Sequence, residues 1–359
     1  MPQLASIVVG VDFSPCSAAA LAQAWLLAKR SRAAIHVLHV VRREVVRELA
    51  LSLGRTVEQV SADLIDGARR QLESFVAGQV GSAGAREGSD ASQASRSSGP
   101  DRPSEPPIPS APDQAARRAG GPGARAGVSA SGDSPPAEVR LHVEVGDPVD
   151  AIVARCAEID ASLLVLGVYG EGGSGMGSGH VSLAGVRHAP CSTLLVHERT
   201  RRPLRAVLAA VDFAPESLIA LDFASRVAEV DGALLRLLHV HYAPWHRLHY
   251  RAPTEESSPE FQRQYLDRLR GLVDDLAERE RALHPGLRVE IDLVDDPSPG
   301  RAILDAAEGG AADLIALGTR RDGRIRKFFI GSNAERVLRN LDVSVIVGRT
   351  PPARQGEGR

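Results

Sequence analysis

The sequence repeats itself, and this repeat limits the folds open to the chain more than any other feature. Residues 7–15 read IVVGVDFSP and residues 207–215 read VLAAVDFAP, at an offset of 200 residues. The tripeptide Leu-His-Val at residues 38–40 recurs at residues 238–240. ASLLVLG at residues 161–167 matches ADLIALG at residues 312–318, where the offset has fallen to 151. The chain therefore holds two copies of one unit, and the first copy is longer by about 49 residues.

The additional length lies in residues 81–137, which are rich in Gly, Ser, Ala and Pro. Ile108 and Val128 are the only large aliphatic residues there, and six arginines balance six acids. Such a segment cannot bury enough apolar area to offset its ordering entropy. We predict a disordered insertion, or equally a regulatory tether, inside a first domain at residues 1–199. A second domain follows at residues 200–350, with a tail at residues 351–359.

Composition excludes several classes of protein. Aromatic residues make up 4% of the chain and hydrophobic residues 43%, so the cores must be aliphatic. The net charge of −2 leaves no broad basic surface for nucleic acid or an anionic membrane. The N-terminal residues lead us to expect no signal peptide, and no run of roughly 20 apolar residues is present. Three distant cysteines indicate reduced thiols, and we expect a cytoplasmic protein.

Apolar runs alternate with helical periodicity in each copy, which indicates βαβ crossovers. We predict an α/β, Rossmann-like fold for each copy, a five-stranded parallel sheet with helices on both faces. In such sheets ligands bind beyond the carboxyl ends of the strands, where the strand order switches. The predicted strands are residues 6–11, 34–40, 140–145, 163–167 and 192–197 in the first copy, and 206–211, 234–240, 288–293, 313–318 and 343–348 in the second.

A glycine-rich loop follows the fourth strand of each copy. In the second copy Gly318 ends the strand, a basic loop with Arg320 and Arg321 follows, and Gly331-Ser332-Asn333 opens a helix. Free N–H groups at a helix start favour an anion. The first copy has Gly167, Gly170 and Gly179 in the corresponding loop, but His180 stands where the second copy has Ser332.

With these loops the sequence strongly resembles the universal stress protein family over nearly all of both copies. The family pattern is Gly, two residues, Gly, nine residues, Gly, then Ser or Thr. The second copy fits except at Arg321, which replaces the second Gly; the first copy has only eight residues before Gly179. The resemblance implies a stress-response protein that binds ATP or a related adenine nucleotide, with or without Mg²⁺, mainly in the second domain.

The resemblance also assigns roles to residues. Asp12 and Asp212 match the acid at the ribose, and Val40 and Val240 match the position whose backbone meets adenine. The phosphates would lie against Gly318, Arg320, Arg321, Gly331, Ser332 and Asn333. Asp12, Val40, Gly167, Gly170 and Gly179 would form a weaker site in the first domain. Pairing of the last strands, within one chain as a pseudo-dimer or between two chains as a homodimer, is a further implication, and a protein partner stays unknown.

Other interpretations stay open. The glycine loops could be tight turns, and both aspartates could be charges at helix starts. The chain could be an interaction scaffold that binds no nucleotide, or a slow ATP hydrolase. No catalytic motif is found and no general base is evident, so an enzyme is not the favoured interpretation. We interpret the histidines at residues 239–249 as surface loop residues and expect no metal site.

Overall fold

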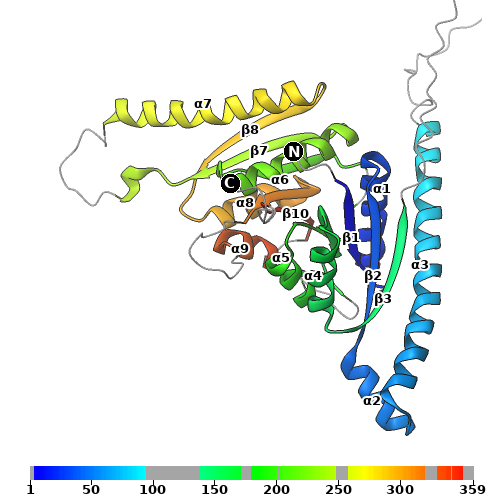
Figure 1. Cartoon of the computed structure of the whole chain (residues 1–359). Coiled ribbons are helices and arrows are strands. Elements are labelled where there is room, and N and C mark those ends of the chain that lie inside the picture. Colours follow the sequence, from blue (N-terminus) through cyan, green and yellow to red (C-terminus); the bar gives the residue numbers. More distant parts are fainter. Residues whose placement is uncertain are drawn as a thin grey trace, which may run out of the picture.

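The computed structural model describes residues 4–93, 138–170, 179–200, 203–247, 258–319, 330–340 and 342–350, and in it each copy forms alternating strands and helices (Figure 1). The strands are β1 (Ser6–Gly10), β2 (Ala34–Arg42), β3 (Val139–Gly146), β4 (Leu163–Gly167) and β5 (Ser192–Val196), then β6 (Ala206–Ala210), β7 (Leu234–His241), β8 (Arg288–Asp295), β9 (Leu314–Gly318) and β10 (Ser344–Gly348). Each predicted strand is present, with ends that shift by at most two residues.

Helices connect the strands in the same order in both copies. The first copy has α1 (Pro15–Ser31), α2 (Arg43–Leu53), α3 (Val57–Gln93), α4 (Pro148–Glu158) and α5 (His180–His188); the second has α6 (Pro215–Asp231), α7 (Pro259–Leu283), α8 (Pro299–Ala307) and α9 (Ser332–Asn340). Five of these helices, α1, α4, α6, α7 and α8, begin with a proline at the first turn, where its missing N–H costs nothing.

Within the described residues, the strands form one ten-stranded sheet in the order β3-β2-β1-β4-β5-β10-β9-β6-β7-β8. All pairs inside each copy are parallel, as predicted. The two copies meet at β5 and β10, which pair antiparallel with Leu195 opposite Val345. The expectation that the last strands make a pseudo-dimer within one chain is therefore confirmed.

Each face of the sheet carries its own aliphatic core. One core receives residues from α1, α3, α6 and α7, and the other from α4, α5, α8 and α9. Both cores draw on both copies, because strand side chains alternate between the faces and the sheet continues from β5 into β10.

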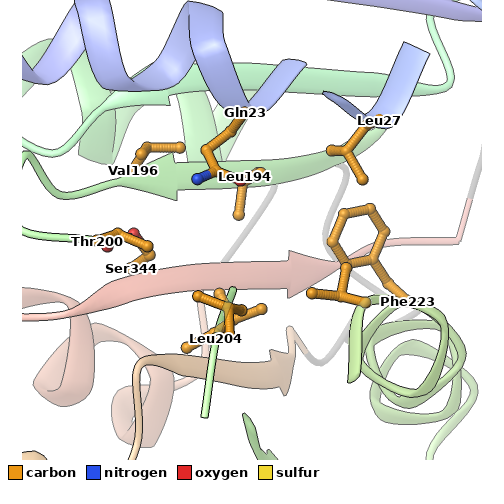
Figure 2. Close-up of a pocket in the computed structure, with 10 residues that line it drawn as sticks. Gln23, Leu27, Leu194, Val196, Thr200, Leu204, Phe223 and Ser344 are labelled. Carbon is orange, nitrogen blue, oxygen red and sulfur yellow. Dashed lines mark hydrogen bonds between the residues drawn. The ribbon is translucent and has the colours of Figure 1, made fainter. Parts of the chain in front are cut away.

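Polar contacts also join the copies at the seam between β5 and β10. The hydroxyl of Ser344 accepts from the His197 N–H at 2.9 Å and lies 2.5 Å from the Thr200 hydroxyl. Ser344 and Thr200 line a cavity of about 20 Å³ together with Leu27 of α1 and Phe223 of α6, whose side chains point toward each other (Figure 2). This volume is about that of one water molecule, so the seam is closely packed.

The first copy departs from the prediction after β2. Helix α3 continues to Gln93, so the expectation of disorder is wrong for residues 81–93. A helix that has been nucleated and packed can extend by one hydrogen bond per residue, which composition alone does not reveal. The other residues of the predicted insertion, 94–137, lie outside the described part, as does the predicted tail from residue 351. Among the helices that the structure describes, none combines the length and apolar character required to cross a membrane.

The shared cores predict that the two copies unfold together. Leu21 of α1 and Leu221 of α6 occupy matching positions, and each is 1% exposed. Leu21→Ala and Leu221→Ala should each lower the free energy of unfolding by about 2–5 kcal/mol through the cavity that they leave. We expect each substitution to move one common calorimetric transition to lower temperature. A separate transition for each copy, with only one moved by each variant, would contradict a shared core.

Candidate functional site

The two aspartates predicted at the ribose each build a tight turn after the first strand of their copy. Asp12 Oδ1 accepts from the Ser14 N–H at 3.1 Å, and Asp212 Oδ1 accepts from the Ala214 N–H at 3.1 Å. The middle residue of each turn is a phenylalanine. Phe13 has a φ of 66° and Phe213 a φ of 60°, a left-handed conformation that is uncommon for a bulky side chain. The short carboxylate therefore fixes the turn that carries it to the carboxyl end of the sheet.

A histidine supports this turn in each copy, and sequence reasoning did not assign it a role. A ring nitrogen of His39 donates to the Val11 carbonyl at 2.8 Å, and His239 donates to the Val211 carbonyl at the same distance. The His39 ring lies 4.6 Å from the Phe13 ring, and the His239 ring 4.9 Å from the Phe213 ring. The repeated Leu-His-Val tripeptide was the signal that could have revealed it.

A cavity lies beyond the carboxyl ends of the strands in each copy. The first has a volume of about 920 Å³ and the second about 290 Å³. Ligand sites in proteins usually measure about 300–1,000 Å³. Both cavities lie where the strand order switches, between the first and fourth strands of their copy, as expected for a doubly wound sheet.

The structure brings most of the predicted site residues to these cavities. The first cavity is lined by all five residues predicted there: Asp12, Val40, Gly167, Gly170 and Gly179. The second is lined by six of the eight: Asp212, Val240, Gly318, Gly331, Ser332 and Asn333. Arg320 and Arg321 lie outside the described residues.

The glycine at the end of the fourth strand is required by packing. A Cβ at Gly318 would lie 2.4 Å from the Ser217 nitrogen at the start of α6, and a Cβ at Gly167 would lie 2.8 Å from Cys16 Cβ. These distances are shorter than real Cβ contacts, so only glycine lets the helix approach the strand. Part of the glycine pattern therefore reports how the fold packs rather than what it binds.

The glycine at the start of the last helix is different. Among the residues that the structure describes, chain neighbours aside, no atom lies within 4 Å of a Cβ built on Gly331, so these residues leave its cavity side open. The Gly331 carbonyl accepts from the Glu335 N–H at 2.9 Å, so the first N–H groups of α9 begin beside this opening. Ser332 is exposed there, and Asn333 is held in place because its Oδ1 accepts from the Gly300 N–H at 3.3 Å.

The interpretation of the histidine run as surface loop residues is wrong for its first two members. His239 and His241 belong to β7 and are 9% and 8% exposed, and burial lowers the pKa of His241.

The next histidine of the run, His246, lies 2.9 Å from Asp295 Oδ2. Burial alone would raise the pKa of Asp295, but its hydrogen bonds to His246 and to the Ala243 N–H lower it. His249 lies outside the described residues, and those that are described contain no cluster of three or more metal-ligating side chains.

The chain matches a family model described as the universal stress protein family over residues 4–197 and again over residues 203–349. It is 30% identical over 148 residues to a universal stress protein encoded in the QAH/OAS sulfhydrylase 3′ region of Thermus aquaticus, an alignment that covers 40% of this chain and 98% of that protein.

Two solved structures share the tandem fold. A universal stress protein from Archaeoglobus fulgidus DSM 4304 superposes with a TM-score of 0.58 at 18% identity, covering 97% of this chain and 99% of that chain. A putative universal stress protein from Pseudomonas aeruginosa UCBPP-PA14 gives a TM-score of 0.51 at 16% identity, covering 96% and 92%.

The two kinds of glycine predict opposite results on substitution. Gly318→Ala should destabilise the fold by about 1–3 kcal/mol, because its methyl group meets backbone atoms of α6 that cannot move aside easily. Gly331→Ala should leave stability nearly unchanged, because its methyl group meets no atom within 4 Å in the part of the chain that the structure describes. Urea unfolding of both variants measures the difference. If Gly318→Ala left stability as nearly unchanged as expected for Gly331→Ala, Gly318 would not be required for packing.

Proposed function

Because the chain belongs to the universal stress protein family, we propose that it is a stress-response protein which binds ATP or a related adenine nucleotide, chiefly in the cavity of the second copy. The observation that carries this proposal is the open helix start at Gly331, Ser332 and Asn333, on the rim of a cavity that also holds Asp212 and Val240. Helix N–H groups and the positive end of the helix dipole favour phosphate at that position.

The chemistry of the lining fits the parts of a nucleotide. Asp212 Oδ1 is engaged in its turn, and the carboxylate as a whole lies on the cavity wall, where it can accept from ribose hydroxyls. Val240, Leu238 and Ile303 offer an apolar wall to the base. Hydroxyl and amide side chains at Ser332 and Asn333 suit phosphate oxygens. Arg320 and Arg321 would add charge on the adjoining loop, as the sequence predicts.

We propose that the nucleotide, with or without Mg²⁺, acts as a regulatory ligand in the cytoplasm. Asp212 is the only side chain with a titratable group among the described residues that line the second cavity. A carboxylate that binds ribose is poorly placed to activate water at a terminal phosphate, and hydrolysis would therefore be slow. The nucleotide would then change the affinity of the chain for a protein partner through its binding energy alone.

We expect isothermal titration of ATP with Mg²⁺ into the full chain to show saturable binding, and Gly331→Val to weaken it at least about tenfold. The valine side chain would project into the opening that the phosphates require, and its Cβ would meet no atom of the described residues within 4 Å. Folding of the variant is checked by its thermal unfolding temperature.

Gly179→Val is the matched control, since Gly179 holds the same position in the first copy and a Cβ there meets only ordinary contacts of 3.5 Å or more. It should leave the second-copy site unaffected. Absence of heat at millimolar ATP in the wild type would refute nucleotide binding and favour the interaction scaffold. Weakening by Gly179→Val instead of Gly331→Val would place the principal site in the first copy.

A further inference from the structure

The two cavities share one framework but differ at the rim. Each of the described residues that line the second cavity has its counterpart in the lining of the first. In the described part of the chain the first cavity has six further lining residues: Phe13, His39, Arg42, Gln71, Tyr169 and Gly170. The counterparts of the last two, Arg320 and Arg321, lie outside the described residues. Arg42 adds a permanent positive charge, and Gln71 adds an amide that can both donate and accept.

Arg42 lies beside the position proposed for the base. It ends β2, two residues beyond Val40, and side chains two residues apart on a strand point to the same face. Its partner in the sheet is Gly146 of β3, which has no side chain to cover it. Arg42 is exposed, and it makes no ion pair or side-chain hydrogen bond with any residue in the described ranges.

The second copy treats the same position differently. Tyr242 stands there, outside the lining of the second cavity, and its ring stacks on His246 at 5.2 Å. Trp245 packs nearby against Tyr265 at 5.3 Å. The second cavity therefore presents apolar side chains and backbone to the base, while the first presents a guanidinium group and an amide.

We propose that the first cavity selects a guanine nucleotide, with Arg42 as the residue that determines specificity; this rests on the proposed function, which places the base beside Val240, the counterpart of Val40. Guanine presents two acceptors, O6 and N7, that match the paired donors of an arginine side chain, whereas adenine presents an amino donor in place of O6. Gln71 can accept from the N1–H or the amino group of guanine through its amide oxygen. One chain would then bind two different purine nucleotides, one in each copy.

The test uses the full chain carrying Gly331→Val, so that titration reports the first cavity. GTP and ATP with Mg²⁺ carry identical phosphates and differ only in the base. We expect GTP to bind at least about tenfold more tightly than ATP, the discrimination typical of a good bidentate contact. Arg42→Ala should remove this preference by weakening GTP while ATP changes little. Arg42→Lys should also lose it, because lysine retains the charge but not the paired donors.

Arg43→Ala is the control, because Arg43 is the next residue, is exposed, and does not line the cavity. It should retain the preference for GTP. Equal affinity for GTP and ATP would overturn the inference. Equal weakening of both nucleotides by Arg42→Ala would also overturn it and would make Arg42 a contact to phosphate. No binding of GTP to the Gly331→Val chain would also overturn it. Failure of the proposed function is distinguishable, because it appears as absence of ATP binding by the wild type.

Discussion

The backbone pairing of β5 with β10 is the interaction on which the arrangement of the whole chain depends. A five-stranded sheet on its own ends in an exposed strand with unpaired N–H and C=O groups. Antiparallel pairing of Leu195 with Val345 satisfies one such edge in each copy at once.

The pairing of β5 with β10 also brings the last helices together, since Arg187 of α5 donates to Glu335 of α9 at 2.7 Å. Arg349, directly after β10, donates to the carbonyls of Val186 and Arg187, near the end of α5. The same helices start at the two cavities, so the seam also fixes the cavity walls.

A second constraint acts inside each copy, where the first helix approaches the fourth strand. Gly318 and Gly167 allow this approach because any Cβ there would overlap the helix start. The approach places the aspartate turn beside the glycine loop, and so the same residues that make the fold also create the hollow above it. A glycine pattern in a sequence of this kind combines a packing requirement with a binding requirement. The structure separates them, since a Cβ at Gly318 would overlap the start of α6, whereas a Cβ at Gly331 would meet no atom of the described residues within 4 Å.

Much of this could be read from the sequence, because the repeat and the apolar runs are local signals. The strands and their parallel order follow from them, and the resemblance to the universal stress protein family indicated most of the residues that line the two cavities. The supporting roles of His39 and His239 could not be read, since a histidine at a strand end gives no sign of which carbonyl it meets. The burial of His241 could not be predicted for a related reason, because the nearby Pro244 and His246 are typical of a loop. The continuation of α3 to Gln93 depends on packing of its earlier turns, where Leu72 is fully buried.

The relative size of the cavities also escaped prediction, and the reason bears on specificity. Their shared walls come from strand ends and helix starts, which the repeat preserves. Their rims come from segments that differ between the copies, since β2 passes directly into α2 whereas β7 turns into a short 3₁₀ helix at Pro244–Arg247. The first path leaves Arg42 and Gln71 on the cavity wall, and the second turns Tyr242 toward His246. A duplicated framework with divergent rims can retain one mode of phosphate binding while each copy changes the base that it accepts. Differences in ligand choice within such a chain should therefore be sought in the segments that the repeat does not share.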